Sequence, residues 1–151
     1  MTVRGFLLLL ALALPGAAFA QPLAVLEQGV VRFVSGGVGL DERAALAAMR
    51  SKFNVRFTAY VPRGGNYLAD IAVAVRDGAG REVLATTMEG PFLLAALAPG
   101  AYSVAAKFAD QSLGRRFTVP AEGPVDVYLP FDDPTAYWEK GMEPERRRPP
   151  R

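Results

Sequence analysis

From residue 55 onward the chain alternates apolar and other side chains with a period of two residues, which is typical of half-buried β-strands. In residues 55–61 the apolar positions are Val55, Phe57, Ala59 and Val61. Residues 71–75 repeat the pattern, and further alternating runs with turn signals between them continue to residue 131. The regular spacing predicts an all-β protein, an antiparallel Ig-like sandwich of about seven strands.

Several segments give more local predictions. Residues 31–34 are expected to form the first strand of a domain spanning 31–131, after a short lead-in at 21–30. The Asp77-Gly78 dipeptide predicts a hairpin between two neighbouring strands. Residues 92–97 form a continuous apolar run, which fits a strand that is buried on both faces or that passes under a helix.

Residues 41–53 are the one segment with a clear helical pattern. Asp41 is placed to cap the helix, and Leu46, Met49 and Phe53 recur at a spacing that gives one apolar face. We therefore expect this helix to lie across one end or one face of the sheet.

Residues 1–20 have the three regions of a secretory signal peptide. Arg4 gives a positive start, residues 6–14 are uninterrupted apolar, and Ala18-Phe19-Ala20 is a small-x-small cleavage site. The apolar run is shorter than the roughly 20 residues that span a bilayer. We expect cleavage near Gln21, no stable membrane insertion afterwards, and a periplasmic or secreted protein exported by general secretion.

The basic excess of the chain lies at its C-terminal end. The sequence has 17 Lys and Arg against 15 Asp and Glu, and five of the basic residues fall in residues 139–151. The domain itself is close to neutral, so we expect no nucleic-acid partner. Residues 132–151 are expected to be a polar, disordered tail. Its Arg146–Arg148 run fits either attraction to an anionic polymer or lipid, or a solubilising terminus.

The sequence contains no histidine and no cysteine. Ser-His-Asp and Cys-His nucleophilic sites therefore cannot form, and neither can zinc sites of the usual nitrogen and sulfur type. We expect no catalytic residues, no metal site, no cofactor and no enzymatic activity.

Two groups of residues are candidates for binding. Gly36, Gly37 and Gly39 precede the predicted helix, and their amides form a candidate anion nest, although a plain glycine hinge explains them as well. The aromatic candidates fall at outward or loop positions, where they can stack on sugar rings or anchor a partner protein. They are Tyr60, Tyr67, Tyr128, Tyr137 and Trp138. The alternative is that they cover sheet edges, pack under the helix or fold the tail back onto the domain.

Residues 67–108 resemble the carboxypeptidase regulatory-like domain, a transthyretin-like sandwich of small exported bacterial proteins. The matching motif is L-x-P-G-x-Y-x-V, here Leu97, Pro99, Gly100, Tyr102 and Val104. The resemblance implies a domain without catalytic activity. We expect Pro99-Gly100 to close a tight turn between adjacent strands, with Tyr102 and Val104 pointing inward.

Two functions fit these features. The first is a binding or accessory module of the bacterial cell envelope that does not catalyse a reaction and has a protein or a glycan as its partner. The alternative is a structural or chaperone-like periplasmic protein that offers a sheet edge to a client strand.

Overall fold

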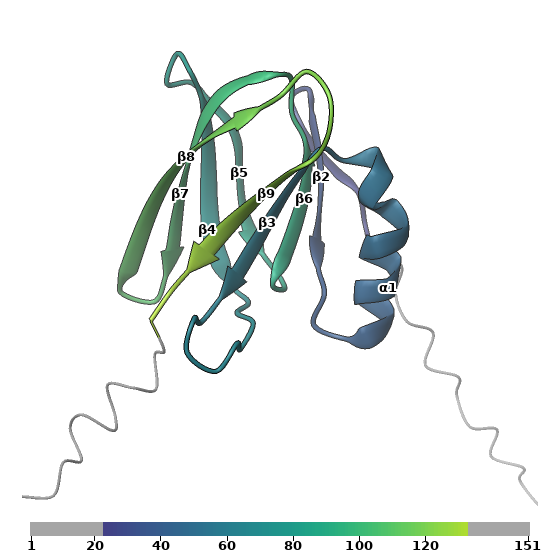
Figure 1. Cartoon of the computed structure of the whole chain (residues 1–151), viewed down its shortest axis with the longest axis vertical. Coiled ribbons are helices and arrows are strands. Elements are labelled where there is room, and N and C mark those ends of the chain that lie inside the picture. Colours follow the sequence, from purple (N-terminus) through teal and green to yellow (C-terminus); the bar gives the residue numbers. More distant parts are fainter. Residues whose placement is uncertain (1–22, 133–151) are drawn as a thin grey trace, which may run out of the picture.

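The computed structural model describes residues 23–132 (Figure 1). The predicted signal peptide, Tyr137, Trp138 and the arginine-rich end of the tail lie outside these residues. Within residues 23–132 no helix is long and apolar enough to cross a membrane.

The described chain is mainly β-structure arranged in two sheets. One sheet has five strands in the order β1-β2-β6-β3-β9, and the other has four in the order β5-β4-β7-β8. A single α-helix and a short 3₁₀ helix follow β2. The elements are β1 (Leu26–Gln28), β2 (Val31–Gly36), α1 (Leu40–Met49), η1 (Arg50–Lys52), β3 (Val55–Tyr60), β4 (Ile71–Asp77), β5 (Glu82–Met88), β6 (Phe92–Ala96), β7 (Gly100–Phe108), β8 (Gln111–Val119) and β9 (Val125–Pro130).

The strand count and the strand directions differ from the prediction. Nine strands are present in the described chain rather than about seven, and one of them, β1, lies in the expected lead-in, where it pairs with β2. All three residues of β1 are exposed, so it has no burial alternation to reveal it. The expected antiparallel arrangement is wrong for one pair, because β3 and β9 run parallel.

The main core lies between the two sheets and takes its residues from both. Val55, Phe57 and Ala59 of β3 are fully buried in it, together with Val75 of β4 and Val104 of β7. These are alternate residues of their strands, as the period of two predicted. The same rule leaves every second residue of β3 and β9 on the outer face of the five-stranded sheet.

A second, smaller core lies between α1 and the outer face of the five-stranded sheet, on the side away from the four-stranded sheet (Figure 1). Leu46 and Phe53 are buried there against Val34 of β2 and Leu94 of β6. Leu93 and Ala95, the neighbours of Leu94, belong to the main core instead. The predictions that the helix covers one sheet face and that residues 92–97 are buried on both faces are therefore confirmed.

The helix begins one residue earlier than predicted and has a different cap. Gly39 is the N-cap and makes no side-chain capping hydrogen bond, whereas Asp41 lies in the first turn. The α-helix ends at Met49 and continues as the 3₁₀ helix η1, so residues 41–53 are not one regular α-helix. Asp41 still places a negative charge at the positive end of the helix dipole.

The Pro99-Gly100 turn joins two sheets rather than two hydrogen-bonded strands, which corrects the prediction. β6 belongs to the five-stranded sheet and β7 to the four-stranded one. The Asn54 side chain braces this crossing: its Nδ2 donates to Leu97 O at 2.7 Å, and its Oδ1 accepts from Leu97 N at 2.9 Å. Val104 is buried, and Tyr102 packs against the same core, as predicted.

Tyr102 fixes the turn from the other side. Its hydroxyl donates to Ala98 O at 2.9 Å, and its ring stacks on Phe117 with ring centroids 5.7 Å apart. Burial raises the pKa of Tyr102, and the nearby Asp77 carboxylate raises this pKa further. The phenol is therefore neutral at physiological pH and keeps the proton that this hydrogen bond needs.

Polar side chains fasten the two sheets together along their edges. On one side Gln28 accepts from Ala85 N of β5 at 2.8 Å, and Ser35 accepts from Glu89 N at 2.8 Å. On the other side the Gln111 amide donates to Asp132 O and accepts from Asp132 N. The Gln28 contact occupies a backbone N–H of the edge strand β5, and the other contacts hold segments that adjoin the strands.

Asp77 closes the predicted β4–β5 hairpin. Its carboxylate accepts from Ala79 N, Arg81 N and Arg81 Nε at 2.9–3.0 Å. The hydrogen bonds from the Arg81 side chain and backbone lower the pKa of Asp77 below its ordinary value of 3.8. Because this pKa is lowered, the ionised carboxylate stabilises the folded state at pH values above the ordinary pKa. This stabilisation is lost as the pH falls through the folded-state pKa.

We expect Asp77→Asn to lower the melting temperature at pH 7 and to match the parent protein at about pH 2. Asparagine keeps an acceptor for the two backbone amides, so the variant removes the charge together with the oxygen that accepts from the Arg81 side chain. Thermal unfolding followed by circular dichroism across this pH range measures the effect, with Asp110→Asn in the β7–β8 turn as the control for losing one negative charge. An equal deficit at both pH values would contradict the proposed role of the charge.

Candidate functional site

Three of the predicted aromatic residues lie on the outer face of the five-stranded sheet. Tyr60 ends β3, and Tyr128 points outward from β9, where the two rings meet edge to face with centroids 6.2 Å apart. An isolated bridge pairs the backbone of Tyr67 with that of Tyr60. We call Tyr60, Tyr67 and Tyr128 the tyrosine face.

The tyrosine face is accessible to a partner. Tyr67 and Tyr128 are 50% and 48% exposed, which is high for large side chains. Tyr60 is half-buried beside them. None of the three tyrosines belongs to the small core under α1. The alternative that they pack under the helix therefore does not hold for them.

The tyrosine face continues into a set of contacts beside α1. The Tyr67 ring lies 5.2 Å from the Phe92 ring, and the Arg43 guanidinium carbon lies 5.2 Å from the centroid of the Tyr67 ring. Arg43 Nε also donates to Gly37 O at 2.8 Å, which holds the side chain in this position. An arginine on the helix is thereby fixed against an exposed aromatic ring.

A groove runs between α1 and the strands beside it. One section has a volume of about 290 Å³. Its apolar walls come from Leu46 and Ala47 of the helix and from Phe92 and Leu94 of β6, and its polar lining consists of three arginines. They are Arg43, Arg50 and Arg56. Arg43, Ala47 and Arg50 share one side of the helix because they are spaced by four and three residues.

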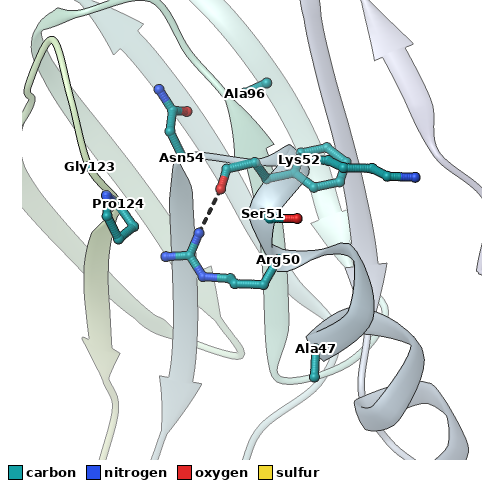
Figure 2. Close-up of a pocket in the computed structure, with 9 residues that line it drawn as sticks. Ala47, Arg50, Ser51, Lys52, Asn54, Ala96, Gly123 and Pro124 are labelled. Carbon is teal, nitrogen blue, oxygen red and sulfur yellow. Dashed lines mark hydrogen bonds between the residues drawn. The ribbon is translucent and has the colours of Figure 1, made fainter.

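The groove widens at the C-terminal end of the helix into an open hollow of about 740 Å³ (Figure 2). Ala47 and Arg50 line both sections, so the two adjoin each other. Gly123 and Pro124 form the opposite wall of the hollow, as Figure 2 shows. Arg50 turns back to donate to Phe53 O at 2.7 Å, while the Lys52 ammonium points away from it (Figure 2). We call the two sections together the helix-side groove.

The charge of the groove is only partly balanced by neighbouring groups. Asp126 of β9 accepts from Arg56 Nε and Nη2 at 2.9 and 3.1 Å and from Arg50 Nη2 at 3.2 Å. One carboxylate thus faces two guanidinium groups, and Arg43 adds a third positive charge. The helix-side groove therefore has a net positive charge with apolar walls.

The predicted glycine nest is already occupied by the chain itself. Glu42 Oε2 accepts from Gly37 N at 2.8 Å and from Val38 N at 3.1 Å. Glu42 is the third residue of the helix, from which a carboxylate reaches back to amides that precede the helix. An external anion would have to displace this carboxylate. The positive φ angles of Gly36 and Gly37 fit the alternative prediction of a plain glycine hinge.

Sequence reasoning named the three tyrosines as separate candidates, but it predicted neither their gathering nor the arginines. Tyr60, Tyr67 and Tyr128 are brought together, whereas Tyr137 and Trp138 lie outside the described residues. The spacing of Arg43 and Arg50 on one helix side was a readable signal, but nothing in the sequence showed which helix side faces β3. Among residues 23–132, no group of three or more acidic side chains is placed to hold a metal ion.

Comparison with known proteins adds no assignment, because neither a family model nor a curated protein matches this sequence. The fold exposes the tyrosine face and the helix-side groove on one side of the molecule. The two meet where Arg43 contacts Tyr67.

Proposed function

We propose that this protein is a binding or accessory module of the cell envelope that does not catalyse a reaction and holds a protein or glycan partner on the tyrosine face. The observation that supports this is the gathering of exposed Tyr67 and Tyr128 with Tyr60 on one rigid sheet face. Tyrosine is enriched at binding interfaces because it gives a large, amphipathic contact area with few rotatable bonds. Export follows from the proposed signal peptide at residues 1–20.

We also propose that the domain is a transthyretin-like sandwich of the carboxypeptidase regulatory-like type. The support is the L-x-P-G-x-Y-x-V segment, whose Tyr102 bonds back across the turn to Ala98 while Val104 enters the core. The assignment is consistent with binding rather than catalysis, although a shared fold does not by itself determine function. A solved structure of a carboxypeptidase regulatory-like domain, superposed on residues 31–131, tests it.

The alternative function is to offer a sheet edge to a client strand, and β8 is the strand best placed for it. This strand has nine residues and forms one edge of the four-stranded sheet. Arg115 and Arg116 are exposed in its middle, however, and charges of this kind protect an edge from further pairing. The tyrosine face is therefore the better supported site.

We expect the Tyr67→Ala and Tyr128→Ala double variant to weaken partner binding by about tenfold or more, because central aromatic anchors carry most interface energy. The assays are capture from envelope extract and a glycan array. Val30→Ala is the control, since Val30 is 98% exposed on the β1–β2 turn, away from the proposed site.

Both variants should keep the melting temperature of the parent protein within a few degrees, which separates a loss of binding from a loss of folding. A partner that the double variant still binds as tightly as the parent would exclude the tyrosine face. Capture and array that both stay silent with the parent protein would contradict the proposed function.

A further inference from the structure

The polar groups that line the narrow section of the helix-side groove are hydrogen-bond donors. Arg43, Arg50 and Arg56 are its only polar side chains among the described residues that line it. The nearby acceptors Gly37 O, Phe53 O and Asp126 already receive hydrogen bonds from these arginines. A ligand that fits must therefore supply acceptors to these guanidinium groups.

The rest of the lining is apolar. Ala47 and Phe92 supply its accessible part, whereas Leu46 and Leu94 are buried and form the floor, which is continuous with the core under the helix. A ligand seated there loses little by presenting hydrocarbon to this surface and gains by excluding water from it. This combination does not suit a neutral sugar, which is covered with hydroxyl groups.

Arg43 is the arginine best placed to bind an anion. Its Nε donates to Gly37 O, which orients the guanidinium, and neither of its Nη atoms makes a hydrogen bond within residues 23–132. Its guanidinium also lies over the Tyr67 ring, with the guanidinium carbon 5.2 Å from the ring centroid, which further restrains the side chain. A preoriented guanidinium edge matches the two oxygens of a carboxylate or a phosphate.

The volume sets the size of the ligand. A section of about 290 Å³ lies at the lower end of the range for small-molecule sites. We infer that the helix-side groove binds a small anionic amphiphile, in which an oxyanion meets Arg43 and an apolar body lies on Ala47 and Phe92 above the buried Leu46 and Leu94. This goes beyond the proposed function, since it assigns a small ligand to the groove whatever partner the tyrosine face holds.

Octanoate and octyl phosphate are the probes, because both have the proposed chemistry and they differ in the head group. Each is titrated into the protein purified as cells produce it, and binding is followed by calorimetry and by backbone amide shifts. We expect a dissociation constant on the order of 0.1–1 mM for at least one of them, with the largest shifts at Ala47 and Leu94. The tighter probe identifies the head group.

Two further ligands separate the two halves of the proposal. Octanol keeps the apolar body without the charge, and glucuronate keeps the charge on a hydroxyl-covered ring. Both are expected to bind about tenfold more weakly or not at all. Equal binding of octanol would overturn the role of the arginines, and equal binding of glucuronate would overturn the role of the apolar walls.

Arg43→Gln should weaken the better probe by about tenfold, because it removes the charge that meets the oxyanion. Arg116→Gln, on an exposed position of the four-stranded sheet, is the matched control and should bind as the parent does. If Arg43→Gln unfolds, Arg43→Lys keeps the charge without the planar fork and should still bind more weakly. Unchanged binding in the Arg43 variants, or no binding of either probe at about 10 mM, would overturn the inference.

The outcome is separable from that of the proposed function. Tyr128 is not among the residues that line the groove, so Tyr128→Ala should bind octanoate like the parent protein. Loss of partner capture in that variant with octanoate binding intact would assign the two activities to two neighbouring sites.

Discussion

Gly90→Ala is expected to lower the free energy of unfolding by about 3 kcal/mol, because the added methyl group has no room. A Cβ at residue 90 would lie 2.4 Å from both the carbonyl carbon and the oxygen of Gly36. These are backbone atoms, so the clash cannot be relieved by turning a side chain. The end of β2 would have to move away from the β5–β6 corner.

Gly114→Ala is the matched control for this substitution. Gly114 lies in the middle of β8, and nothing lies within 4 Å of an added Cβ there. Because alanine also restricts the unfolded chain more than glycine does, this variant should change the stability by less than about 1 kcal/mol. Urea unfolding followed by circular dichroism measures both, and equal midpoints for the two variants would contradict the close approach of Gly90 to Gly36.

The close approach of Gly90 to Gly36 is a feature that the sequence alone did not predict. The glycines at 36, 37 and 39 stand out in the chain, and a turn or an anion nest is the local explanation for them. The structure adds a reason for glycine at residue 90, which depends on the backbone of residue 36 far away in the sequence, whereas a Cβ at residue 36 would meet the side chains of Leu23 and Glu42. Close packing of two backbones leaves no local pattern, because each glycine alone looks like an ordinary turn residue.

The strand pattern, by contrast, was readable because burial alternates within each strand. The alternation in residues 55–61 placed Val55, Phe57 and Ala59 inward, where they are buried. It carries no information about which strands pair or in which direction. The parallel pairing of β3 with β9 sets Thr58 opposite Tyr128, and this brings Tyr128 diagonally next to Tyr60. The outward tyrosines were therefore predictable one by one, and their gathering was not.

The helix beside the site was also predictable only in part. Leu46, Met49 and Phe53 marked the apolar face, and that face packs on the sheet as expected. The capping role given to Asp41 falls to Gly39, while Glu42 reaches back to the preceding amides. A capping box would have Ser or Thr at the cap and a glutamate bonded to the cap amide, whereas here the cap is glycine and Glu42 accepts from Gly37 N and Val38 N. The role of Arg43 required knowing that Tyr67 and Phe92 lie beside the helix.

Phe57→Ala is expected to lower the free energy of unfolding by about 4 kcal/mol, since it leaves a cavity between the two sheets. Phe57 is fully buried at the centre of β3, and its ring meets Phe117 of β8 edge to face with centroids 5.5 Å apart. Phe117 in turn stacks on Tyr102, so these rings connect the five-stranded sheet with the four-stranded sheet. Phe57→Leu keeps most of the volume and should cost less.

The coupling between the sheets can be measured directly with Phe117→Ala and the double variant. Phe117 is half-buried, so its own replacement should cost less than that of Phe57. Residues in contact are not additive, and we expect the double variant to differ from the summed single effects by about 0.5–1.5 kcal/mol. Additive effects in urea unfolding would mean that the rings do not couple. A small loss in Phe57→Ala alone would show that the interior between the sheets is not closely packed.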